Sequence, residues 1–161
     1  MISKLMAISS LLACFWSSQA WAFQTIVLVR HAEKVDESRD PLLSEQGQKR
    51  AQNLAKLLRD AGIEQVFATE YQRTQLTAKP LLDAQKIELS SYLAKESQEF
   101  GVRLLKTTKN TLVVAHSNTL NTVLKGLGID DAKPIADDEY DRLVIVQLPK
   151  QGPALMTVLR Y

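Results

Sequence analysis

The chain has 161 residues, of which 45% are hydrophobic and 24% are charged, and its formal net charge is +2. This composition is typical of a globular protein and excludes a largely disordered chain. The small net charge excludes binding to nucleic acid through a bulk positive field, and the length favours one domain.

The first 22 residues have the pattern of a secretory signal peptide. A lysine near the start precedes an apolar stretch from Leu5 to Trp16, and Ala20-Trp21-Ala22 forms an A-x-A cleavage pattern. We therefore expect a mature chain that begins near Phe23 after cleavage near Ala22 and is periplasmic or secreted. Residues 23–161 would then form a single domain.

Two alternatives exist for this leader segment. An uncleaved anchor helix is disfavoured because the apolar stretch is shorter than the roughly 20 residues that a membrane span needs. Processing as a lipoprotein at Cys14 is the other alternative. Cys14 is the only cysteine, so a chain cleaved near Ala22 would contain no disulfide and no thiolate metal site. We expect no membrane span in the mature chain.

Apolar runs alternate with amphipathic segments along the rest of the chain. Strands are expected at residues 25–29, 65–68, 87–90, 111–115, 142–148 and 154–160. Helices are expected at residues 45–59, 72–84, 92–106 and 119–127, the first with Ser44 as N-cap. This alternation predicts an α/β protein, a three-layer α/β/α sandwich whose mainly parallel sheet has an antiparallel edge.

The only two histidines each follow an apolar strand directly. Arg30 and His31 come directly after the first strand, and His116 follows the strand 111–115. In parallel sheets, ligands bind outside the carboxyl ends of the strands, so both imidazoles are expected at one rim. A two-histidine metal site is disfavoured because the permanently charged Arg30 repels a cation.

An arginine beside a histidine suits a phosphate group instead. Arginine binds phosphate oxygens with paired hydrogen bonds, and a neutral imidazole nitrogen can attack phosphorus. Arg73 lies near the start of the second helix, and the amide of Asn118 could donate to a phosphate oxygen. The alternative for Asn118 is a purely structural role as N-cap of the helix that begins at Thr119.

Four motifs occur in the order found in one family. They are LVRHAEK, LSEQGQKRA at residues 43–51, ATEYQRTQLTA at residues 68–78, and VAHSN at residues 114–118. Together they resemble the histidine phosphatase superfamily, whose fold is phosphoglycerate mutase-like. The resemblance implies that His31 accepts the phosphoryl group, that Arg30, Arg73 and His116 form the phosphate pocket, and that Asn118 supports it. It implies no metal and no other cofactor.

The proton donor does not follow from the resemblance. The acid phosphatase branch places an aspartate directly after the second histidine, where this chain has Ser117. Candidates are Glu33, which is close in sequence to His31, and Glu96 or Glu99, which lie between the second arginine and the second histidine as in the mutase branch. The alternative for each is a solvated or ion-paired surface carboxylate.

The sequence therefore favours an exported, metal-independent phosphatase that acts through a phosphohistidine. Its substrate would be a phosphomonoester, or another phosphorylated small molecule or glycan. The alternative is a non-catalytic anion-binding protein that keeps the pocket but lacks an efficient general acid. Two loops, residues 34–41 and the acidic run 137–141, are the expected rims of the site.

Overall fold

Strand β1 (Phe23–Arg30) lies inside a six-stranded sheet in the computed structural model, which describes residues 23–161. The strand order is β3-β2-β4-β1-β5-β6. The other strands are β2 (Gln65–Thr69), β3 (Leu89–Tyr92), β4 (Thr111–Ala115), β5 (Arg142–Pro149) and β6 (Leu155–Arg160). Strands β1 to β4 pair in parallel, whereas β5 and β6 form an antiparallel edge.

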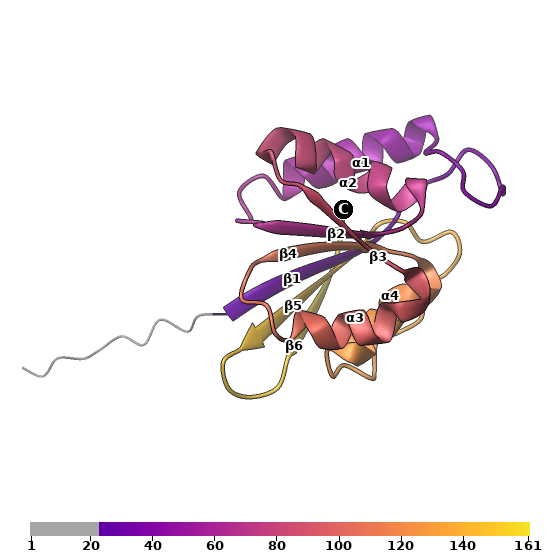
Figure 1. Cartoon of the computed structure of the whole chain (residues 1–161). Coiled ribbons are helices and arrows are strands. Elements are labelled where there is room, and N and C mark those ends of the chain that lie inside the picture. The colour runs from indigo at the N-terminus through magenta and orange to yellow at the C-terminus, as the bar shows by residue number, and fades with distance from the viewer. Residues whose placement is uncertain (1–22) are drawn as a thin grey trace, which may run out of the picture.

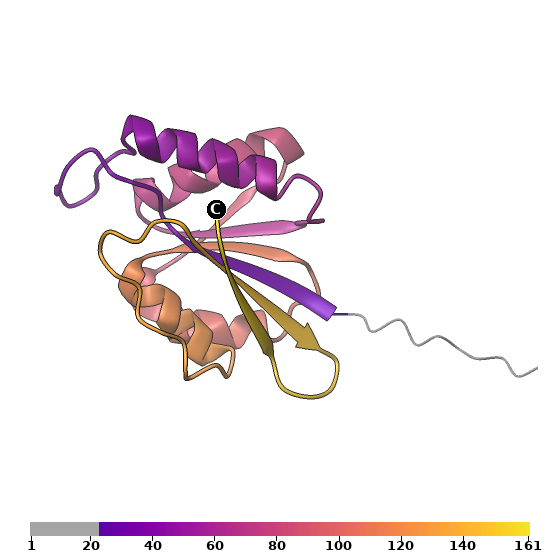
Figure 2. The ribbon, with the colours of Figure 1, turned by 180° about the vertical axis from the view of Figure 1, so that it is seen from behind.

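Helices cover both faces of this sheet (Figures 1 and 2). Helices α1 (Glu45–Leu57) and α2 (Gln72–Gln85) pack together on one face, and α3 (Ser97–Leu104) and α4 (Ser117–Gly126) pack together on the other. A short 3-10 helix, Ala94–Glu96, precedes α3. The expected α/β/α sandwich with a mainly parallel sheet is confirmed.

The alternation of side chains along β1 explains the two layers. Ile26 and Leu28 belong to the apolar cluster beneath α3 and α4, whereas Val27 and Val29 belong to the cluster beneath α1 and α2. Successive side chains of a strand point to opposite faces, so a strand covered on both sides must be apolar throughout. This is why the run before Arg30 shows no polar alternation.

The loop after β1 is fastened to the start of α1. Ser44 caps α1 as predicted, because its hydroxyl accepts a hydrogen bond from the backbone N of Gly47 at 3.1 Å. A Cβ at Gly47 would lie 2.1 Å from the carbonyl oxygen of Glu33. Only glycine therefore allows this close approach, which fixes the backbone two residues beyond His31.

Most predicted boundaries differ from the observed ones by one or more residues, and three of these differences have a clear physical cause. The strand expected at 87–90 is β3 at Leu89–Tyr92, because the backbone N of Ile87 still closes the end of α2 on Leu82. The helix expected at 92–106 begins later because Tyr92 stacks on Phe100 as part of β3 (ring centroids 3.9 Å apart).

The third correction concerns the helix expected at 119–127. Helix α4 begins at Ser117, so its N-cap is His116 and Asn118 lies in the first turn. The structural alternative for Asn118 as N-cap is therefore wrong. The hydroxyl of Thr119 accepts a hydrogen bond from the backbone N of His116 at 3.1 Å and closes this turn.

The described residues contain no helix long and apolar enough to cross a bilayer. The predicted signal peptide, its cleavage near Ala22 and the alternative at Cys14 all lie outside residues 23–161.

Candidate active site

Strands β1 and β4 bring the two histidines together. The strands are parallel neighbours, with Arg30 paired to Ala115. The backbone N of His31 donates to the carbonyl of Ala115 at 2.9 Å, which extends the pairing to the first residue of the site. The His31 and His116 rings lie 5.3 Å apart between centroids. Both imidazoles therefore occupy the same rim of the sheet.

Hydrogen bonding and burial fix the state of His31. Its Nδ1 lies 2.8 Å from the carbonyl oxygen of Ala32. A carbonyl only accepts, so Nδ1 carries the proton and Nε2 keeps its lone pair. Burial, together with the charges of Arg30 and Arg73, lowers the pKa of His31 to about 4. At neutral pH the residue is an uncharged imidazole with a free nucleophilic nitrogen.

His116 is also neutral, but its proton is on Nε2 and not on Nδ1. Its Nδ1 faces Nη2 of Arg73 at 3.3 Å, and a guanidinium only donates, so Nδ1 accepts. Nε2 then carries the proton and donates to the hydroxyl of Thr69 at 2.9 Å. Burial, followed by the charge of Arg73, lowers the pKa of His116 to about 3. The Thr69 hydroxyl is itself hydrogen-bonded to that of Thr74.

Arg30 is held by the loop before β5. Its Nη1 donates to the carbonyl oxygens of Ala136 at 2.9 Å and Asp137 at 2.8 Å. Its guanidinium also stacks on the ring of Tyr140, with Cζ 4.1 Å from the centroid. The Nε of Arg30 is buried and has no hydrogen-bond partner among the described residues. This donor is free for a ligand.

Arg73 enters the site from the first turn of α2. Its guanidinium stacks on Tyr71, with Cζ 4.4 Å from the ring centroid, and Nη1 lies 3.7 Å from a carboxylate oxygen of Asp40. Its buried Nε also lacks a partner within residues 23–161. Buried polar groups are nearly always satisfied, so two such donors indicate a ligand with acceptor oxygens.

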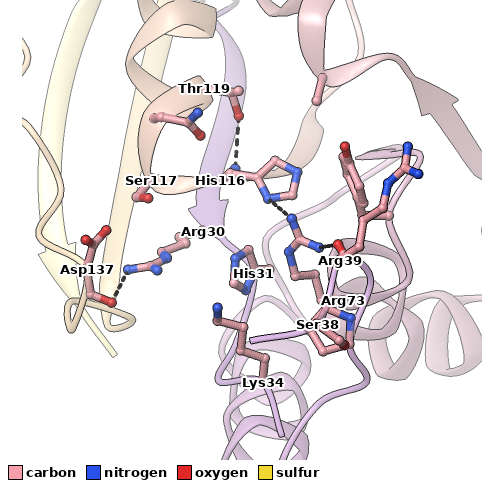
Figure 3. A pocket seen from close by; sticks show the side chains of 14 residues that line it. Arg30, His31, Lys34, Ser38, Arg39, Arg73, His116, Ser117, Thr119 and Asp137 are labelled. Carbon is pink, nitrogen blue, oxygen red and sulfur yellow. Dashed lines mark hydrogen bonds between the residues drawn. The ribbon is translucent and has the colours of Figure 1, made fainter. Parts of the chain in front are cut away.

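These side chains line a cavity of about 490 Å³ at the carboxyl ends of the strands (Figure 3). The cations that line it are Arg30, Lys34, Arg39 and Arg73. Residues Ser117, Asn118 and Thr119 line it at the N-terminus of α4, whose free backbone N–H groups also favour an anion. The cavity is therefore built for a negatively charged group.

The acidic candidates lie elsewhere. Glu33 does not line the cavity, and Arg50 donates to both of its carboxylate oxygens, the shortest contact being 2.7 Å. Burial acts to raise the pKa of Glu33, but the Arg50 hydrogen bonds and further contacts together leave that pKa below its ordinary value. Half-buried Glu96 and exposed Glu99 are likewise not among the lining residues. Proton donation by these three residues stays a prediction.

Several residues around the cavity did not stand out in the sequence. Thr69 is the last residue of β2 and its polarity after an apolar run was the one available signal. Lys34 and Arg39 belong to the loop predicted as a rim, and Asp137 and Tyr140 to the acidic run. The contacts of Thr69 with His116, of Asp137 with Arg30 and of Tyr140 with His31 depend on strand order, which composition does not reveal.

In the part of the chain that the structure describes, no group of three or more His, Cys, Asp or Glu side chains could hold a metal ion.

Comparison with known proteins gives a family match and a fold match. The model of the histidine phosphatase superfamily (branch 1) matches residues 26–102. No curated protein matches the chain. Its fold is similar to that of the alpha-ribazole phosphatase from Shigella flexneri, with a TM-score of 0.70, 17% identity, and coverage of 86% of this chain and 96% of that one.

Two further solved structures share the fold. The protein histidine phosphatase SixA complexed with tungstate gives a TM-score of 0.67 at 16% identity, covering 85% of this chain and 97% of that one. The phosphoserine phosphatase from Entamoeba histolytica, in complex with 3-phosphoglyceric acid, gives 0.63 at 13% identity, covering 86% and 97%. At these identities the likeness establishes the fold.

Proposed function

We propose that this chain, whose residues 26–102 match the model of the histidine phosphatase superfamily (branch 1), is an exported, metal-independent phosphatase that forms a phosphohistidine on His31. The observation that carries this proposal is the state of His31. A neutral Nε2 with a free lone pair lies in a cavity lined by four cationic side chains. The family match independently supports phosphatase activity.

The cavity supplies the charge stabilisation that phosphoryl transfer needs. In the transition state, negative charge spreads over three equatorial oxygens, and fixed donors stabilise it best in a buried site. The unpartnered Nε groups of Arg30 and Arg73 are such donors. The backbone N–H groups at the start of α4 add to them.

The proposed reaction has two displacements. Nε2 of His31 attacks phosphorus while the bond to the ester oxygen breaks, and the alcohol leaves with a proton. Water then attacks phosphorus and the N–P bond breaks, which releases phosphate and restores neutral His31. His116 supports this scheme by orienting Arg73, whose Nη2 donates to its Nδ1 at 3.3 Å.

The substrate class is a small phosphorylated molecule or glycan. A cavity of about 490 Å³ falls within the roughly 300–1,000 Å³ range of small-ligand sites. The phosphatases of similar fold differ in the group that carries the phosphate. Export rests on the leader pattern in the first 22 residues.

The test measures hydrolysis of 4-nitrophenyl phosphate in the presence of a strong chelator, by the wild-type protein and by His31→Ala. We expect turnover by the wild type and none above background by the variant. Equal turnover by both would overturn the assignment of His31. Loss of wild-type turnover in the chelator would overturn metal independence.

The second candidate is a non-catalytic anion-binding protein. The near absence of carboxyl groups favours it, since only Asp137 among the cavity-lining residues of the described chain could donate a carboxyl proton. Binding of inorganic phosphate or tungstate without hydrolysis of any aryl phosphate would support this candidate over the enzyme.

A further inference from the structure

Asp137 occupies a distinctive place in the cavity. It is the only carboxyl-bearing residue that lines the cavity within residues 23–161, because Glu33, Glu96 and Glu99 do not line it. Figure 3 shows Asp137 on the side away from Arg73 and Arg39, with Arg30 and His31 between. Asp137 therefore lies at the cavity on the side opposite the second arginine.

The backbone of Asp137, rather than its carboxylate, binds Arg30. Its carbonyl oxygen accepts a hydrogen bond from Nη1 of Arg30 at 2.8 Å. The carboxylate makes no hydrogen bond or ion pair with any other described residue, so it is free for a ligand. Glu33 differs, because its two carboxylate oxygens are already occupied by Arg50.

The loop that carries Asp137 is held in place by Arg142 at the start of β5. Nη1 of Arg142 donates to the carbonyl of Lys133 at 2.7 Å, and Nη2 donates to that of Pro134 at 3.1 Å and to the carboxylate of Glu139 at 2.7 Å. A loop tied on both sides of Asp137 presents that residue to the cavity in a defined position.

We propose that Asp137 is the general acid and general base of the phosphatase reaction, which rests on the proposed function. In the first displacement, the carboxyl proton of Asp137 passes to the ester oxygen as the P–O bond breaks and the bond between P and Nε2 of His31 forms. In the second, the Asp137 carboxylate takes a proton from the attacking water as the N–P bond breaks. The carboxyl group is then restored.

General acid catalysis of this kind contributes roughly 10²–10⁴-fold, and it matters most for a poor leaving group.

The test compares two substrates and two variants. 4-Nitrophenyl phosphate has a good leaving group that needs little protonation, whereas phenyl phosphate has a poor one. We expect Asp137→Asn to lower kcat/KM for phenyl phosphate by roughly 10²-fold. The same variant should change kcat/KM for 4-nitrophenyl phosphate by less than about 3-fold, since the phosphoryl contacts persist. Asp138→Asn is the matched control, because Asp138 is exposed and does not line the cavity.

The other possible outcomes would overturn the assignment of Asp137. An equal fall for both substrates would overturn the acid role and indicate that Asp137 only shapes the loop. No fall for either would also overturn it. Steeper leaving-group dependence in Glu96→Gln or Glu33→Gln, but not in Asp137→Asn, would assign the donor to that glutamate. Absence of turnover by the wild-type protein would overturn the proposed function together with this role, and is thereby distinguished from failure of Asp137 alone.

Discussion

The ends of β1 and β4 look alike in sequence but hold their imidazoles differently. At the end of β1, the adjacent carbonyl of Ala32 binds Nδ1 of His31 and leaves Nε2 free. At the end of β4, Thr69 binds Nε2 of His116 and Arg73 binds Nδ1. Both rings are neutral, yet only one has an unoccupied lone pair. The partner of the second nitrogen, and not the position after a strand, distinguishes a nucleophile from a supporting group.

The largest effect should separate the two histidines. Removal of the nucleophile in His31→Ala should lower kcat by roughly 10⁴-fold or more, because no other described group offers the same nitrogen. Removal of the imidazole that accepts from Arg73 in His116→Ala should lower kcat by roughly 10²–10³-fold, because the Arg73 donors lose their position. Single-turnover kinetics with 4-nitrophenyl phosphate measure both. Equal losses would mean that the two strand ends are functionally equivalent, contrary to the comparison.

The next largest effect concerns the pH dependence of the free energy of unfolding. The pKa values of His31 and His116 are lowered by burial to about 4 and about 3, below the unfolded value of 6.5. As the pH falls below 6.5, the unfolded chain takes up protons before the folded one, which favours unfolding. The contribution of the two neutral histidines to the free energy of unfolding is therefore complete above pH 6.5. It is lost as the pH falls from 6.5 to about 4 for His31, and from 6.5 to about 3 for His116.

Urea unfolding in phosphate-free buffer at several pH values between about 7.5 and about 5 checks this prediction. Within that window each histidine should contribute a slope of up to about 1.4 kcal/mol per pH unit to the free energy of unfolding. The double variant His31→Gln, His116→Gln should lose that part of the slope. A double variant with the wild-type slope would show that the two rings are not held neutral.

The smallest expected effect concerns the hydroxyl of Thr69, which accepts a hydrogen bond from His116. Thr69→Val removes the hydroxyl that accepts from Nε2 of His116, so His116 can turn or change tautomer and orient Arg73 less well. We expect kcat/KM to fall by about 10-fold, as for the loss of one buried hydrogen bond. Thr157→Val, on the exposed strand β6, is the control and should be unchanged. Loss of activity in both variants would contradict a specific role for Thr69.

Local patterns in the sequence predict the strands of this fold and the shared position of the two histidines. The apolar run before Arg30 predicts a strand buried on both faces, and the rule for parallel sheets predicts that His31 and His116 share a rim. Helix starts were less predictable where a polar residue could serve more than one position, as Ser117 and Asn118 show at α4.

The rest of the site depends on contacts between distant segments. Thr69 reaches His116 because β2 pairs with β4, and Asp137 reaches Arg30 because the chain returns from α4 to β5 across the rim. Neither contact can be predicted from the hydrophobic periodicity of the sequence. Glu33 illustrates the reverse case, since its nearness to His31 in sequence makes it a candidate proton donor, whereas its carboxylate is bound to Arg50.

The assignment of His31 as the nucleophile is tested most directly by locating the phosphoryl group on the enzyme. The wild-type protein would be mixed with 4-nitrophenyl phosphate, quenched within one turnover under alkaline conditions that preserve phosphohistidine, and mapped by mass spectrometry. We expect one phosphoryl group on His31 and none in His31→Ala. Phosphorylation of His116, or turnover with no phosphorylated histidine, would contradict it.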